Sequence, residues 1–306
     1  MRIIFAGTPE IAVPSLRAVA AAGHDIVGVI TRDDAPLGRK RVLTASPVAA
    51  AAQEMGVPLF KANSLGQEAV RWAADLAPDL GVVVAYGGLL REPLLSVPPL
   101  GWVNLHFSEL PQWRGAAPVQ RALMAGQHRL GVTVFRLVAA LDAGPVLTRD
   151  TLQFAEGTSA GHALRTLAER GTTALTHAIN LLGQSSDAGE PQTGEPTYAH
   201  KLTREDGLID LTQPRDRVLA HWAGVTPEPG AFVMLAGQPL KLLHLTPTEL
   251  SPPAHAAPGS AHLVQQHAVL VLADGVLEIA RVQPAGKPAM SGADWLRGRG
   301  SEVRFA

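Results

Sequence analysis

RIIFAGTPEIAVPSLRAVAAAGHDIVGVIT, residues 2–31, opens the chain with two apolar runs on either side of an alanine-rich segment. Residues 2–6 and 26–31 are short and largely apolar, which is typical of buried strands. Between them, Thr8 is suited to cap a helix over residues 9–22, with a proline at its first position and a glycine after its end. A strand, a helix and a second strand in this order predict an α/β fold with a parallel, Rossmann-like sheet.

The turn after the first strand lacks a dinucleotide-binding motif. Such motifs have the form G-x-G-x-x-G, in which the glycines let the backbone approach a pyrophosphate. Here Gly7 stands without the other two glycines. We therefore predict no dinucleotide site and interpret this segment as an ordinary strand-to-helix turn.

A second informative stretch, WVNLHFSELPQWRGAAPVQRALMAGQHRLGVTVFRLVAALDAGPV, spans residues 102–146. Its first five residues predict a strand on which Asn104 and His106, two positions apart, project from the same face. An amide and an imidazole side by side can donate hydrogen bonds to one carbonyl oxygen and stabilise negative charge developing there. Asp142 follows in a turn, where a carboxylate could orient the histidine or handle protons. Each of these residues taken singly is more often structural than catalytic.

Composition limits the classes of protein to consider. With 306 residues the chain exceeds the size at which one core usually stops growing, so two domains are expected. Without cysteine it can form neither disulfides, cysteine zinc sites nor thiol nucleophiles. A net charge of −1 means that a nucleic-acid partner would be held by local basic clusters. Because no apolar run reaches a membrane span and no signal peptide is visible, we expect a cytoplasmic protein without a membrane partner.

The second half of the chain predicts a change of domain. Residues 159–182 have the spacing of a long helix with one apolar face, and the polar, turn-rich residues 183–196 indicate a linker. Beyond it, short apolar runs alternate with Pro and Gly turns, which predicts a small β-barrel. We therefore predict a catalytic domain over residues 1–184, a linker over 185–203 and a C-terminal domain over 204–306.

The motifs of residues 102–146 follow a specific order: Asn-x-His, Ser-x-Leu-Pro, Trp-Arg-Gly-Ala-Ala-Pro and Leu-Asp-x-Gly. This order resembles that of the folate-dependent formyltransferases. The resemblance implies a Rossmann-like catalytic domain, an OB-like barrel after it, and catalytic roles for Asn104, His106 and Asp142. It also implies that two turns enclose the folate, through Ser108, Glu109, Leu110, Pro111, Tyr86, Gly87 and Leu89. Glu109 departs from the pattern, since bacterial members usually have Leu there.

Residues 32–44, RDDAPLGRKRVLT, form a polar loop centred on Arg39, Lys40 and Arg41. A run of charges is usually a solvated surface, but basic side chains on a loop also suit phosphates. The loop resembles an insertion in those family members that formylate methionyl-tRNA, where it is thought to contact the acceptor arm of the initiator tRNA. Members that act on small substrates generally lack it.

The resemblance therefore implies transfer of a formyl group from 10-formyltetrahydrofolate to the α-amine of initiator methionyl-tRNA, for translation initiation, by a monomer that needs no metal. Asn104 and His106 would stabilise the oxyanion, and Asp142 would keep His106 oriented and protonated. Three alternatives stay open. They are a formyltransferase for a small amine, such as an amino sugar nucleotide or glycinamide ribonucleotide, a hydrolase of 10-formyltetrahydrofolate, and a non-catalytic RNA-binding protein on the same fold.

Overall fold

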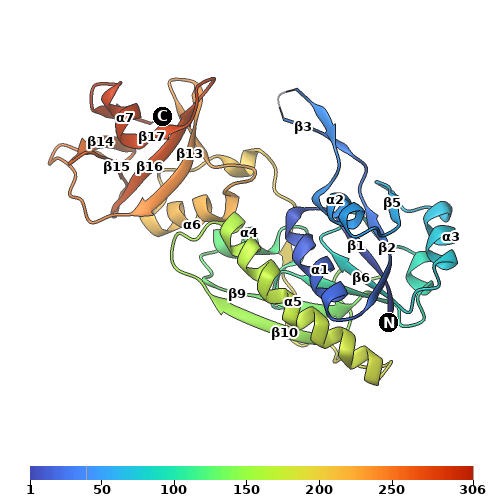
Figure 1. Ribbon diagram of the computed structural model, residues 1–306. Helices are drawn as coiled ribbons and strands as arrows, with labels where there is room; N and C mark the ends of the chain where they lie inside the picture. The colour runs from blue at the N-terminus through green and yellow to red at the C-terminus, as the bar shows by residue number, and fades with distance from the viewer. Residues whose placement is uncertain (39, 306) are drawn as a thin grey trace. The chain divides into compact units, whose positions relative to one another are not determined.

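The computed structural model describes residues 1–38 and 40–305 (Figure 1). These residues form two compact units. The first comprises Met1–Ala116, Leu130–Leu152 and Leu164–Ala199, and the second comprises Ala117–Arg129, Gln153–Ala163 and His200–Ala306. The second unit thus takes two segments, Ala117–Arg129 and Gln153–Ala163, that precede its main part in the sequence. Among the helices described, none is both long enough and apolar enough to cross a membrane.

The first unit is built on a mixed sheet. Its strands lie in the order β10 (Val146–Gln153), β9 (Arg129–Arg136), β7 (Trp102–His106), β6 (Leu80–Val84), β1 (Arg2–Gly7), β2 (Asp25–Thr31) and β5 (Leu59–Lys61). The strands from β7 to β5 run parallel, and β9 is antiparallel to β7. The predicted Rossmann-like, mostly parallel sheet is confirmed.

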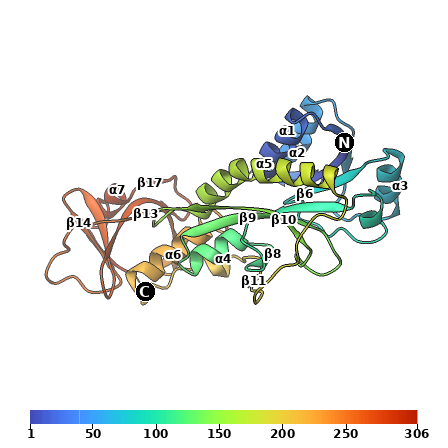
Figure 2. The same ribbon diagram turned by 90° about the horizontal axis from the view of Figure 1, so that it is seen from below.

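Helices cover both faces of this sheet, which is why its central strands are apolar throughout. Residues 3–6 of β1 are fully buried, as expected of a parallel strand covered on both sides. The helices α1 (Val13–Ala21), α2 (Pro47–Glu54) and the main part of α5 (Ala160–Gln184) lie along one face (Figure 2). On the other face α3 (Gln67–Asp75) contributes to an apolar cluster with β1, β2, β6 and β7.

Contacts on both of its faces position β7. On one face the Trp102 ring lies over β6 at Gly81, where a Cβ would come within 2.1 Å of the indole. The Trp102 Nε1–H donates to the Leu94 carbonyl at 3.0 Å. On the other face Leu105 packs against Gly171 of α5, at 3.0 Å from where a Cβ would stand. Because side chains alternate along a strand, Asn104 and His106 share the face of Trp102. They lie at the carboxyl end of a parallel strand, where ligands bind in open α/β sheets.

Two local predictions are wrong. Thr8 is not an N-cap, because a 3₁₀ turn, η1 (Glu10–Ala12), precedes α1, which begins at Val13. The Thr8 hydroxyl instead donates to the Tyr86 carbonyl at 2.8 Å. It therefore joins the turns that follow the carboxyl ends of the neighbouring strands β1 and β6. The loop of residues 32–44 is also more ordered than predicted, since β3 (Ala35–Leu37) pairs antiparallel with β4 (Val42–Thr44) as a hairpin.

The second unit contains a curled antiparallel sheet. Its strands follow the order β12 (Phe232–Leu235), β13 (Gln238–Pro247), β16 (Val276–Pro284), β15 (His267–Val271), β14 (Ser260–Val264) and β18 (Glu302–Arg304), with β17 (Met290–Ser291) beside β16. The register of β13 on β16 shifts on either side of His244, and such irregularities bend a strand. The sheet therefore curls into a half-barrel, which confirms the predicted small, OB-like barrel.

The helices α4 (Pro118–Met124), α6 (Arg215–Val225) and α7 (Gly292–Arg297) belong to the same unit as this half-barrel. The Trp222 and Leu219 side chains of α6 and the Trp295 and Leu296 side chains of α7 are buried in one apolar cluster with the strands. Met124 of α4 packs against that cluster. A helix from the N-terminal half of the sequence therefore completes the core of the second unit.

Candidate active site

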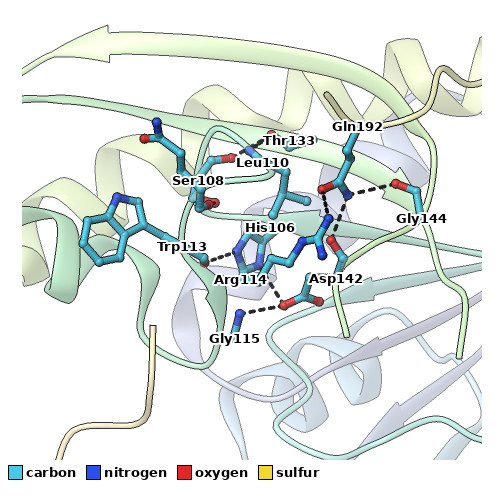
Figure 3. Close-up of polar contacts among 11 residues, drawn as sticks. His106, Ser108, Leu110, Trp113, Arg114, Gly115, Thr133, Asp142, Gly144 and Gln192 are labelled. Atoms are coloured by element: carbon cyan, nitrogen blue, oxygen red, sulfur yellow. Dashed lines mark hydrogen bonds and ion pairs between the residues drawn. The ribbon is translucent and has the colours of Figure 1, made fainter. Parts of the chain in front are cut away.

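The imidazole of His106 is buried at the end of β7, with 6% of its surface exposed (Figure 3). Its Nε2 lies 2.9 Å from the carbonyl oxygen of Trp113, whose indole points away from it. Because a carbonyl oxygen accepts hydrogen bonds and cannot donate them, Nε2 carries a proton. The ring is thereby fixed with Nδ1 toward Asp142.

Asp142 lies next to this ring, as predicted. Its Oδ2 is 4.0 Å from Nδ1 of His106 and accepts a hydrogen bond from the backbone N–H of Gly115 at 2.8 Å. The residue has a φ of +45°, a left-handed conformation that aspartate tolerates better than most residues. The structure therefore brings His106 and Asp142 together from segments 36 positions apart, by their residue numbers.

Asn104 is partly exposed on the same face of β7. Within residues 1–38 and 40–305, its side-chain amide has no hydrogen-bond partner. An amide held on a rigid strand and unengaged by the protein can donate to a ligand. Asn104, His106 and Asp142 thus offer a hydrogen-bond donor, a proton-binding nitrogen and a carboxylate in one place.

Burial holds the pKa of His106 below its usual value of 6.5, although the Asp142 charge and the Trp113 carbonyl both act to raise it. Removal from water disfavours the imidazolium, and a carboxylate 4.0 Å away compensates for this loss in part. The lowered pKa argues against the expectation that Asp142 keeps His106 protonated. When the ring is neutral, its proton is on Nε2 and its lone pair is on Nδ1.

Sequence reasoning missed Gln192, which holds the turn of Asp142. Its Nε2 donates to the carbonyls of Asp142 and Gly144, at 2.8 and 2.9 Å. Its Oε1 in turn accepts from Nη2 of Arg114 at 2.7 Å. Gln192 falls in the predicted linker, and nothing in the sequence there distinguishes it from its polar neighbours. Figure 3 shows the Arg114 guanidinium pointing toward Gln192, which lies above Asp142.

The turn of Ser108, Glu109, Leu110 and Pro111, predicted to contact folate, is pinned by β9. The Thr133 hydroxyl donates to the Ser108 carbonyl at 2.7 Å and accepts from the Leu110 N–H at 3.1 Å. The Ser108 hydroxyl donates to the Gln112 carbonyl at 2.6 Å, and both Ser108 and Leu110 are buried. Glu109 packs over Gly131, where a Cβ would come within 2.6 Å of its Cγ. These side chains hold the shape of the turn.

The other predicted folate turn follows β6, the neighbour of β7. The Tyr86 side chain is buried, and its hydroxyl donates to the Ala62 carbonyl at 2.7 Å. The Gly87 carbonyl accepts from Nη1 of Arg32 at 2.8 Å, whereas the Leu89 side chain is 66% exposed. The two turns therefore follow the carboxyl ends of adjacent parallel strands.

Two of the basic residues predicted to bind tRNA, Lys40 and Arg41, lie between the strands of the β3–β4 hairpin, which projects from the first unit (Figure 1). Lys40 and Arg41 are exposed, and Arg39 lies outside the described residues. Leu37 and Leu43 beside them are 67% and 70% exposed, so the tip carries apolar side chains as well as charge.

Comparison with known proteins shows relatives along the whole chain. The family described as "Formyl transferase" matches residues 1–179, and "Formyl transferase, C-terminal domain" matches residues 201–300. The methionyl-tRNA formyltransferase of Leifsonia xyli subsp. xyli is 50% identical over 306 residues, which cover 99% of each chain.

Two solved structures share the fold at low sequence identity. Methionyl-tRNA formyltransferase from Clostridium thermocellum has a TM-score of 0.57 and 14% identity, over 81% of this chain and 94% of that chain. HypX from Aquifex aeolicus, in complex with tetrahydrofolic acid, has a TM-score of 0.64 and 18% identity, over 97% of this chain and 47% of that chain. At these identities the two structures support the fold and nothing further.

Proposed function

Because the chain belongs to the formyl transferase family, we propose that it transfers the formyl group of 10-formyltetrahydrofolate to the α-amine of initiator methionyl-tRNA. The observation that carries the proposal is that Asn104, His106 and Asp142 lie together at the end of β7. The chain that holds them is 50% identical, over 99% of its length, to a named methionyl-tRNA formyltransferase. The alternatives of a small-amine formyltransferase and of a hydrolase are not favoured by the named relatives.

In this proposal the uncharged amine attacks the formyl carbon. A nitrogen–carbon bond forms, and negative charge develops on the formyl oxygen. The Asn104 amide donates a hydrogen bond to that oxygen, and the absence of a described partner for the amide supports this role. Removing one such donor from an enzyme typically costs about 10² to 10³ in kcat.

The neutral His106 takes the proton that the attacking amine must lose. Nδ1 is the free nitrogen of the ring, and proton transfer to it creates an imidazolium beside the Asp142 carboxylate. That imidazolium is a second donor for the formyl oxygen. When the bond from the formyl carbon to N10 of the folate breaks, the proton passes to N10 and the tetrahydrofolate leaves. Each of these steps uses a side chain of this protein and none needs a metal.

We further propose that the two predicted folate turns, Ser108, Glu109, Leu110 and Pro111 together with Tyr86, Gly87 and Leu89, enclose the folate. The exposed Leu89 offers an apolar contact there. Arg39, Lys40 and Arg41 on the hairpin would contact tRNA phosphates. Residues 1–184 would carry catalysis and residues 204–306 would bind RNA, joined by 185–203. All these parts come from one chain, so we propose a monomer.

A formylation assay with different acceptors tests the proposal. The chain is incubated with 10-formyltetrahydrofolate and, separately, charged initiator tRNA, charged elongator tRNA, glycinamide ribonucleotide, an amino sugar nucleotide, or buffer. We expect formylation of the initiator tRNA, and loss of about 10² or more in kcat when Asn104→Ala is assayed in parallel. Preferential formylation of a small amine, or release of formate in buffer at the same rate, would refute the tRNA assignment.

A further inference from the structure

Two histidines and a glutamate meet at the edge of the C-terminal half-barrel, in the second unit. His262 on β14 and Glu302 on β18 are direct partners across an antiparallel pair. His255 comes from residues 248–259, which lead into β14. One donor atom from each of the three lies within 4.8 Å of the others.

A hydrogen-bond chain fixes the tautomer of His262. The Ser260 hydroxyl donates its single proton to the Ala257 carbonyl at 2.6 Å. At 2.7 Å from Nε2 of His262, the same oxygen can then only accept, so Nε2 carries a proton. A neutral His262 therefore has its lone pair on Nδ1. The His262 side chain is only 3% exposed, so the residues around it fix its orientation.

This lone pair faces another electron-rich atom. Nδ1 of His262 is 3.8 Å from Oε2 of Glu302, and the same oxygen is 3.7 Å from Nε2 of His255. Both distances are too long for hydrogen bonds. Three donor atoms thus converge on a common point, an arrangement that a cation between them would stabilise.

The two distances from the Glu302 oxygen are close to those around a tetrahedral metal ion, and the two imidazole nitrogens lie within 4.8 Å of each other. Bonds of about 2.0–2.2 Å from zinc to nitrogen and oxygen put the donor atoms about 3.3–3.6 Å apart. The two separations from the Glu302 oxygen exceed this by a few tenths of an ångström. The Glu302 and His255 side chains are 55% and 70% exposed, so both can move the remaining distance.

We propose that His255, His262 and Glu302 bind one divalent transition-metal ion, with Zn²⁺ as the best match. Two imidazole nitrogens and one carboxylate oxygen suit zinc, whereas Mg²⁺ and Ca²⁺ prefer oxygen ligands throughout. The bond from His262 to Ser260 is the kind of supporting contact that metal-bound histidines make through their other nitrogen. The ion would join residues 248–259 and β18 to β14, so its binding should stabilise the half-barrel.

Zinc titration of the full chain tests this site. The protein is treated with EDTA, exchanged into buffer and titrated with Zn²⁺ by calorimetry, with Mg²⁺ as a second titrant. We expect one Zn²⁺ per chain and no Mg²⁺ binding. Ser260→Ala should weaken zinc affinity by about 10- to 100-fold, and His255→Ala and Glu302→Gln by at least as much. Zinc should also raise the unfolding temperature of the parent by more than that of these variants at the same zinc concentration.

His267→Ala is the matched control. His267 is an exposed histidine whose Nδ1 lies 2.8 Å from Oε1 of Glu278, but it is outside the three-residue cluster. It should bind zinc as the parent does. Since His255 and Glu302 are exposed, their variants should keep the parent's far-UV spectrum without zinc. If the parent binds no Zn²⁺ at micromolar concentration, or if His255→Ala and Glu302→Gln bind as tightly as the parent, the cluster is a surface ion pair and the proposal fails.

Discussion

The protonation of His106 determines which chemistry this side chain can perform. Burial lowers its pKa, so we expect the ring to titrate below 6.5. Asp142→Asn should lower the pKa further, because the carboxylate acts to raise it. Titration of the ring proton signals by NMR, with His106→Gln to identify the resonance, measures both values. A ring that titrates above 6.5 in the parent would contradict the assignment of Nδ1 as a proton acceptor.

The same pKa shift affects stability. Between the lowered pKa in the folded chain and 6.5 in the unfolded chain, the unfolded chain binds more protons at this group. The free energy of unfolding should therefore fall as pH drops through this window, and His106→Gln should reduce that dependence. Urea unfolding of parent and variant at a series of pH values checks the sign.

Gln192 is a positioning residue for Asp142. Gln192→Leu removes both hydrogen bonds to the turn and leaves two partly buried carbonyls without that donor, at a cost of about 1–3 kcal/mol in stability. We expect kcat to fall by roughly 10-fold or more with little change in KM for tRNA, since misplacement of a catalytic group by about 1 Å can cost 10² in rate. Gln192→Glu keeps the acceptor for Arg114 but loses the donor, so it should behave as Leu does. Full activity in Gln192→Glu would show that these two bonds do not matter.

Sequence predicted the part of the site that local rules govern. The alternation of side chains along a strand places Asn104 and His106 on one face, and the motif order brings Asp142 to them. The depth at which His106 is buried depends on packing from Phe135 and the Trp113 turn, so its neutral state could not be predicted. Gln192 acts across 50 positions through hydrogen bonds to backbone, which leave no local pattern in the sequence.

The β3–β4 hairpin is the element that distinguishes the tRNA proposal from a small-substrate enzyme. Replacing Arg39, Lys40 and Arg41 together by Ala should weaken tRNA binding and leave folate affinity unchanged. The slope of log K against log salt should flatten by up to about two to three, since each phosphate contact contributes roughly 0.7–0.9. Titration with initiator tRNA at several salt concentrations measures this.

Arg17→Ala provides the control for that experiment. Arg17 is an exposed cation on α1 whose Nη2 pairs with Oε2 of Glu54 at 3.0 Å. It should keep the parent's affinity and salt slope. Parallel slopes for the parent and the hairpin variant would instead make Arg39, Lys40 and Arg41 a solvated surface.

Local composition predicted where most elements lie, but it did not predict the regular hairpin within residues 32–44. Residues 32–44 have the Gly, Pro and charged residues of a loop, yet Pro36 pairs with Leu43 in a hairpin. A proline is tolerated there because both strands of a two-stranded hairpin are edge strands. At Thr8 the cap pattern was misleading, since the hydroxyl has a partner in the Tyr86 turn, 78 positions away.

Over the whole molecule, the compact units cross the boundaries that composition suggests. Residues 117–129 precede the predicted linker by more than fifty positions, yet they belong to the second unit. The reason is the apolar face of α4, from which Met124 packs into the core of the half-barrel. Composition shows that residues 183–196 are polar and turn-rich, but it carries no information on which core an earlier helix completes.

The α4–α6 contact therefore offers a test of how the second unit is assembled. A Cβ at Gly224 of α6 would lie 2.4 Å from Cγ of Met124 and 2.5 Å from the Gln120 carbonyl oxygen. Gly224→Ala should lower the free energy of unfolding by about 1–3 kcal/mol, since a backbone atom cannot move aside as a side chain can. Gly298→Ala is the control, because its φ is −67° and the nearest atom to its Cβ would be 3.6 Å away. Urea unfolding of both variants decides the matter. If Gly224→Ala were as stable as the parent, the close approach of α4 to α6 would not contribute to stability. Residues 200–306 could then form the second unit without α4.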